Sequence, residues 1–130
     1  DVEAAETFTA ECSYQHYRIA ELDGQPVGLI SWRTQGGLHY GVAELTRLAV
    51  VSGILDPRAI KESLFDVMIA EADHFYRQHG SKLRKVFSMI HADSKHIRDF
   101  FQDKGMHQEA VLRSHFHAGT DELVYSMFIA

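Results

Sequence analysis

The central third of the chain reads as strand, helix and strand in succession, and this order limits the fold more than any other feature. Residues 40–51 (YGVAELTRLAVV) are apolar and β-branched, which predicts a strand whose end is buried on both faces. Asp56 and Pro57 are typical of a helix start, and apolar side chains then recur at helical spacing up to Gly80. Residues 85–91 predict a second strand. Because a crossover helix joins parallel strands, we expect an α/β sheet.

Shorter patterns on both sides of this unit predict hairpins. Residues 16–21 and 27–32 read as strands around the turn at Asp23 and Gly24, and residues 108–116 and 122–129 flank a turn over residues 118–121. A short helix over residues 94–104 ends at Gly105, and residues 1–15 resemble the end of a helix. Hairpins added to a parallel pair give a mixed sheet.

Length, charge and cysteine content exclude several classes of protein. The 130 residues suffice for one domain, residues 1–130, and no apolar run approaches the ~20 residues of a membrane span. The net charge of −5 argues against nucleic acid and anionic membranes as partners. A single cysteine, with no signal segment, indicates a cytoplasmic protein. His115 and His117 would share one face of a strand but need a third ligand to hold zinc, so we expect no metal site.

The C-terminal part of the chain contains a spaced motif. Residues 94–106 (SKHIRDFFQDKGM) precede Glu109-Ala-Val-Leu-Arg113, Gly119 and Asp121. This spacing resembles the Asn-x-x-Ala-x-x-Phe-Tyr-x-x-x-Gly-Phe motif, and the strand, turn and Asp after it, of the GNAT superfamily of acyl-CoA N-acyltransferases. The branch it is most similar to acetylates ribosomal-protein N-termini, polyamines and amino sugars. The resemblance implies a mixed central β-sheet flanked by helices, with the N-terminal part of the fold reduced or missing.

A second stretch, residues 43–50 (AELTRLAV), resembles the central strand of that family, whose backbone holds the pantetheine arm of CoA. The resemblance therefore implies acetyl-CoA or another acyl-CoA as co-substrate. It also predicts that the strand ending near Val51 splays from the strand beginning near Lys85 and leaves a cleft for the thioester arm. It places the donor contacts at Leu48, Ala49, Val50, Val51, Arg58, Ala59, Ile60, Lys61, Ser94 and Phe101.

Residues of the motifs also depart from the family pattern. The glycine-containing loop that cradles the CoA pyrophosphate corresponds to residues 56–61 (DPRAIK), which lack glycine. There the helix N-terminus remains, and Arg58 and Lys61 are either phosphate ligands or ordinary solvated charges. The family's tyrosine, which protonates the leaving thiolate, falls on Phe101, and its helix-leading Asn falls on Ser94. Phenylalanine has no proton to donate, so we expect slower transfer but not its loss.

Candidate catalytic residues follow from the same comparison. Glu44 matches a glutamate that several family members use as general base on the incoming amine, with a surface carboxylate as the alternative role. Tyr125 and Tyr40 are candidate replacement acids. His91, at the end of a strand that should border the cleft, is a candidate base or substrate contact. All three also fit ordinary structural roles. Alternation places Arg47 on the face opposite Glu44 unless a bulge intervenes.

Three functions remain open at this point. The first is transfer of an acyl group, acetyl above all, from acyl-CoA to a primary amine of a small molecule or peptide, and the acidic composition would suit a cationic acceptor. The second is an N-acyl synthase that takes its acyl group from acyl carrier protein, because residues 44–47 (ELTR) also resemble a motif of such enzymes. The third is a catalytically inactive GNAT-like module that binds an acyl thioester or a protein. A homodimer is compatible with all three.

Overall fold

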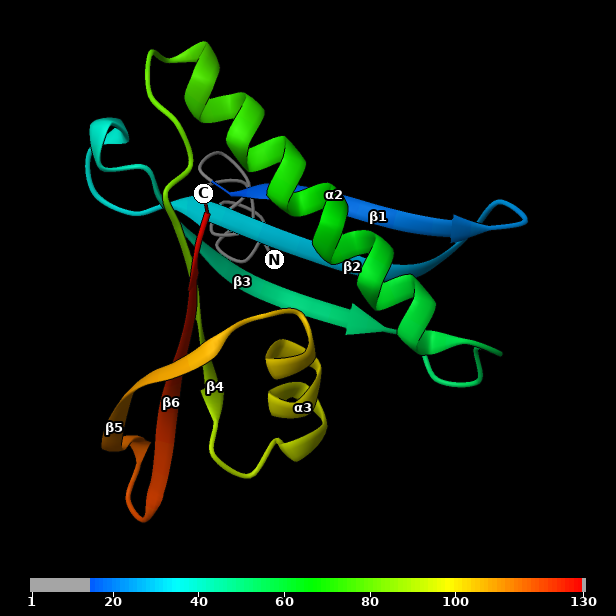
Figure 1. Ribbon diagram of the computed structural model, residues 1–130. Coiled ribbons are helices and arrows are strands. Elements are labelled where there is room, and N and C mark those ends of the chain that lie inside the picture. The colour runs from blue at the N-terminus through cyan, green and yellow to red at the C-terminus, as the bar shows by residue number, and fades with distance from the viewer. Residues whose placement is uncertain (1–14, 130) are drawn as a thin grey trace, which may run out of the picture.

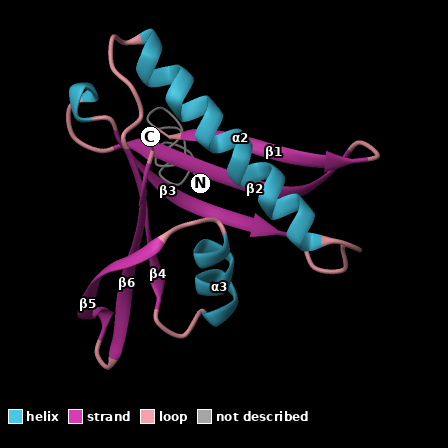
Figure 2. Ribbon diagram, viewed as in Figure 1, coloured by secondary structure: helices cyan, strands magenta, loops and turns pink. Residues whose placement is uncertain are grey.

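The computed structural model describes residues 15–129, and the helix end expected over residues 1–15 lies outside this range except for Gln15, which is in neither a helix nor a strand. Six strands form one mixed sheet in the order β1-β2-β3-β4-β6-β5 (Figures 1 and 2). The elements in chain order are β1 (His16–Leu22), β2 (Gln25–Thr34), the 3-10 turn η1 (Leu38–Tyr40), β3 (Val42–Val50), α2 (Pro57–Gln78), β4 (Lys85–His91), α3 (Lys95–Asp103), β5 (His107–His117) and β6 (Thr120–Phe128).

Most of the expected elements are confirmed, and the differences have local causes. The Asp56 carboxylate accepts a hydrogen bond from the Ala59 N–H at 3.1 Å, so it caps α2 as expected. The third strand begins at Val42 and not at residue 40, because η1 occupies the preceding residues. The last turn is also shorter than expected, since Thr120 already pairs with His117.

Both helices pack on one face of the sheet, and the hydrophobic core lies between the helices and the sheet. The long helix α2 crosses β1, β2 and β3 (Figure 1). Its buried side chains, among them Phe65, Met68 and Tyr76, pack against Ile30 and Trp32 of β2. The shorter helix α3 contributes Phe100 and Phe101, and the Phe101 ring lies 6.4 Å from that of Tyr125 on β6. Two helices therefore cover two halves of one sheet.

The first strand includes a partly buried histidine whose titration should affect stability. The His16 ring stacks on Trp32 with centroids 4.1 Å apart. Burial lowers the pKa of His16 below its ordinary 6.5, against the smaller opposite effect of the Glu71 carboxylate.

Below about pH 6.5 the unfolded chain takes up a proton at His16 before the native chain does, so the free energy of unfolding falls as the pH drops. We expect His16→Phe, which keeps the stack but cannot titrate, to lose less stability than wild type between about pH 7.5 and about pH 5.5. Urea unfolding of both proteins at the two pH values measures this difference. Equal losses would show that His16 does not contribute to the acid sensitivity.

Candidate functional site

The two parallel strands of the sheet pair only at their start. The β3–β4 ladder consists of Val42 with Lys85, Ala43 with Val86 and Glu44 with Phe87. Beyond these pairs β3 continues to Val50 and β4 to His91 without pairing with each other, and the two strands diverge (Figure 1). The splayed strands and the opening between them that the sequence predicts are thus confirmed.

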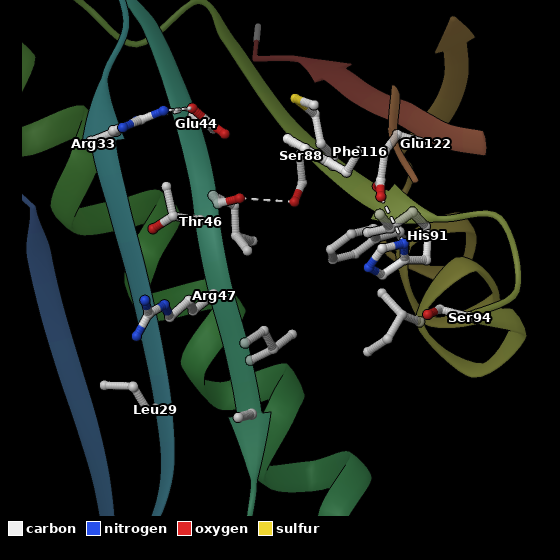
Figure 3. A pocket seen from close by; sticks show the side chains of 17 residues that line it. Leu29, Arg33, Glu44, Thr46, Arg47, Ser88, His91, Ser94, Phe116 and Glu122 are labelled. Atoms are coloured by element: carbon white, nitrogen blue, oxygen red, sulfur yellow. Dashed lines mark hydrogen bonds and ion pairs between the residues drawn. The ribbon is translucent and has the colours of Figure 1, made fainter. Parts of the chain in front are cut away.

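A serine side chain closes the narrow end of this opening. The Ser88 hydroxyl donates a hydrogen bond of 2.8 Å to the backbone carbonyl of Leu45, at the first position where the strands no longer pair (Figure 3). Farther along, no strand within residues 15–129 pairs with the edge of β3 that faces β4. Backbone N–H and C=O groups on such an edge are available to a ligand that can act as an added strand. Ser88 belongs to none of the sequence motifs, although a polar residue inside an apolar strand is a visible signal.

A cavity of about 730 Å³ occupies the opening and continues onto the sheet face that α2 does not cover. One wall comes from β2 and β3, and the other from β4, α3 and the β5–β6 hairpin (Figure 3). Its lining includes Glu44, Arg47, Leu48, Ala49, Ser88, His91, Ser94, Phe101 and Glu122.

The end of β3 is less buried than expected. Ala43, Glu44 and Leu45 at its start are buried, whereas Ala49 near its end is exposed. The expectation of a strand end buried on both faces is therefore wrong. The divergence of β4 removes the cover from this half of the strand.

A β-bulge changes which β3 side chains share a face. Arg47 pairs with Ser31, but Leu45 already pairs with Trp32, so Thr46 is an extra residue in the ladder. Directly opposed side chains point to the same face, and therefore Arg47 lies on the Glu44 face of the sheet. The expectation from simple alternation, which placed them on opposite faces, is wrong for this reason (Figure 3).

The Glu44 carboxylate is buried at one end of the cavity and held in place by two donors. One of its oxygens, Oε1, accepts hydrogen bonds from Arg33 at 3.0 Å and from the Gln35 amide at 2.6 Å. No hydrogen bond of the other oxygen, Oε2, is found among residues 15–129. The geometry therefore fixes the carboxylate and leaves one oxygen available to a ligand.

The opposite wall carries a second charged pair. The His91 Nδ1 atom lies 2.7 Å from Oε1 of Glu122, and both side chains line the cavity (Figure 3). Glu122 is buried and His91 is half exposed. The sequence indicated His91 through its place at the end of a strand, but not its carboxylate partner.

The candidate positions for the family's acid, which are Phe101, Tyr125 and Tyr40, differ in whether they reach the cavity. Phe101 and Ser94, two of the expected donor contacts, line the cavity. Tyr125 does not line it, because its ring is buried behind Phe101 and its hydroxyl accepts a 3.3 Å hydrogen bond from the Gln102 amide. Tyr40 is exposed in η1 and is not part of the lining either. The structure thus brings no tyrosine hydroxyl of the described residues to this cavity.

The N-terminus of α2 is not a wall of the cavity. Arg58, Ala59, Ile60 and Lys61 lie outside its lining. The Arg58 guanidinium pairs with Glu62 at 3.0 Å and with Asp103 of α3 at 2.9 Å, which connects the two helices. Of the expected donor contacts on β3, Leu48 and Ala49 line the cavity, whereas Val50 and Val51 border a shallower apolar groove beside β1 and β2.

No group of three or more potential metal ligands is found within residues 15–129. In the same range, none of the helices has the length and apolar character required to cross a membrane.

Solved structures share this architecture. An aminoglycoside 6'-N-acetyltransferase solved with coenzyme A matches 100% of this chain over 81% of its own length, at 16% identity and a TM-score of 0.77. The ribosomal-protein-alanine N-acetyltransferase of Escherichia coli matches 96% of this chain over 76% of its own, at 12% identity and a TM-score of 0.75. A Desulfovibrio desulfuricans chain assigned to the GNAT acetyltransferases matches 98% over 76%, at 22% identity and a TM-score of 0.74.

This likeness establishes the fold. The mixed six-stranded sheet flanked by helices is the GNAT fold, as the sequence predicts. No protein-family model and no curated protein matches the sequence.

Proposed function

We propose that this chain transfers an acyl group, acetyl in the first instance, from a CoA thioester to a primary amine of a small molecule or peptide. The observation that carries the proposal is the opening between β3 and β4, where the ladder ends after Glu44 and Phe87 and a cavity of about 730 Å³ follows. The shared fold and a CoA complex of one structural neighbour support it.

The donor would lie along the free edge of β3. The pantetheine arm contains two amides at strand-like spacing, so it can form hydrogen bonds with backbone groups beside Leu48 and Ala49. Ser94 and Phe101 would contact it from α3. The opening is narrowest at Ser88, and the thioester carbonyl would stop there.

The reaction is aminolysis of a thioester. The acceptor ammonium loses one proton to the free oxygen of Glu44, and the neutral nitrogen then attacks the thioester carbon. A C–N bond forms and the C–S bond breaks, while the second amine proton must leave and the sulfur must gain one. Because the site holds both reactants in contact, proximity supplies a large part of the rate enhancement.

The charges around the cavity constrain the acceptor. Arg47 is exposed on the Glu44 face, and no ion pair of its guanidinium is found among residues 15–129. A guanidinium binds carboxylate or phosphate and repels a second cation. We therefore favour an amine that carries an anionic group, such as a free amino acid or a peptide with an acidic residue at its N-terminal end, over a polycationic acceptor of the kind that the acidic composition suggested.

A second candidate function differs in the donor. The Asp56 carboxylate already occupies an N–H group at the start of α2, and Arg58 is engaged by Glu62 and Asp103. These carboxylates compete with a pyrophosphate for the same donors. A pantetheine arm presented by acyl carrier protein would not need them, which favours that donor as the alternative.

Calorimetric titration with acetyl-CoA, acetyl-pantetheine and an acetylated carrier protein, followed by assay of free thiol release with an amine panel, tests both candidates. If CoA is the donor, as we propose, acetyl-CoA should bind and acylate an amine. Transfer from the carrier protein alone would select the second candidate. Binding of a donor without transfer to any amine would leave a binding module, and no binding at all would contradict every thioester function.

A further inference from the structure

The pair of His91 and Glu122 has the geometry of an oriented imidazole. The two residues are directly opposed in the β4–β6 ladder, so neighbouring strands fix their separation. The His91 Nδ1 atom lies 2.7 Å from Oε1 of Glu122, whose side chain is only 5% exposed. An ionised carboxylate can only accept a hydrogen bond, and Nδ1 must therefore carry the proton.

This contact determines what the other ring nitrogen can do. With Nδ1 donating to Glu122, the neutral imidazole has its lone pair on Nε2, at the opposite side of the ring. The His91 side chain is 54% exposed and lines the cavity, so Nε2 is accessible to a ligand there (Figure 3). A carboxylate behind an imidazole also stabilises the imidazolium that forms when Nε2 takes a proton.

The position of His91 complements the chemistry that the site otherwise lacks. Glu44 lies on the β3 wall, whereas His91 shares the β4–α3 wall with Ser94 (Figure 3). Phe101 of α3 also lines this wall. Phe101 cannot protonate a leaving thiolate, and Tyr125 lies outside the cavity lining. Among the described residues that line this wall, His91 has the one imidazole, a group that can accept a proton on one nitrogen and later donate it.

We propose that His91 carries the proton from the attacking amine to the departing sulfur, and that Glu122 is its positioning residue. This inference rests on the proposed acyl transfer. As the C–N bond forms, Nε2 accepts the second amine proton, and the imidazolium returns it to sulfur as the C–S bond breaks. The products are the amide and the free thiol. His91 ends neutral and Glu44 releases the first proton to solvent, so no further reactant is required.

Replacement of His91 by alanine is the first test. We expect His91→Ala to lower kcat by about 10²-fold with little change in donor affinity, and added imidazole to restore at least about tenfold of the loss. His96→Ala is the matched control, because His96 is exposed on α3 outside the cavity lining, and it should keep the wild-type rate. A purely structural role for His91 would give no recovery with imidazole.

Two further variants test the assignment of roles. Phe101→Tyr puts a phenol on the same wall, so it should raise the rate of His91→Ala by a larger factor than that of wild type. Glu122→Gln keeps the shape but loses the charge that stabilises the imidazolium, and we expect kcat to fall about tenfold or more without imidazole rescue. The imidazole nitrogen chemical shifts of the wild-type protein should show that neutral His91 carries its proton on Nδ1. This measurement does not depend on catalytic activity.

The inference is overturned if His91→Ala transfers at the wild-type rate, if imidazole fails to restore a variant that still binds donor, or if neutral His91 carries its proton on Nε2. These results leave the acyl transfer itself standing. A wild-type protein that binds the thioester but acylates no amine would remove the proposed function and this proton transfer together.

Discussion

Glu44→Gln should lower turnover by ~10²–10⁴-fold and leave donor affinity unchanged, if general-base catalysis contributes its usual amount. The amide keeps an oxygen that can accept the hydrogen bonds of Arg33 and Gln35, so the wall of the cavity should hold its shape. What it loses is the ability to take a proton from the acceptor ammonium. Steady-state kinetics combined with calorimetric titration of acetyl-CoA separates the two effects.

The control for this variant is Glu21→Gln. Glu21 is an exposed carboxylate at the end of β1, outside the cavity lining, and its loss should change neither turnover nor binding. A Glu44→Gln protein with the turnover of wild type would show that the amine reaches the site already neutral or loses its proton to another group. A variant that no longer binds the donor would instead assign Glu44 a structural role.

Gly41→Ala should destabilise the fold by more than about 3 kcal/mol, because a side chain there meets backbone. Gly41 has a φ of +67°, and a Cβ atom would lie 2.2 Å from the carbonyl oxygen of Lys82. Its own carbonyl accepts hydrogen bonds from Arg84 at 2.7 Å and Lys85 at 3.1 Å, just before the β3–β4 pairs begin. The backbone of Gly41 therefore contacts the segment 82–85, and this contact connects the start of β3 with the start of β4.

Gly24→Ala provides a matched comparison. Gly24 also has a positive φ, of +78°, but an added Cβ would have no atom within 4 Å. Its cost is limited to the backbone conformation, about 1 kcal/mol. Urea denaturation of the two variants should give clearly different midpoints. Equal midpoints would show that the segment around Lys82 moves aside and that the contact at Gly41 does not hold the strands together.

The succession of elements could be predicted from the sequence because each depends on local signals. Apolar periodicity, the cap at Asp56 and the glycine after α2 are all readable in short windows, and the structure confirms them. The divergence of the parallel strands was expected from the family resemblance and not from any local pattern. Its physical cause in this chain includes the Ser88 side chain, which takes the Leu45 carbonyl where a ladder bond would otherwise form.

The arrangement of the site was only partly predictable. The bulge at Thr46 moves Arg47 to the face of Glu44, and a one-residue shift of register leaves no trace in an alternating apolar pattern. The contact between His91 and Glu122 depends on the register of two strands that are distant in sequence. Periodicity reports the face of a single strand, but it cannot report which residue of another strand lies opposite.

The most direct test of the account is an amide chemical-shift titration of the isotopically labelled protein with acetyl-CoA. We expect the largest changes along β3 after Leu45, at Ser88 to His91, and at the start of α3 around Ser94, because these segments border the opening in the sheet. Changes confined to the outer strands β1 and β5, or no change at saturating concentration, would contradict the assignment of this opening as the thioester site.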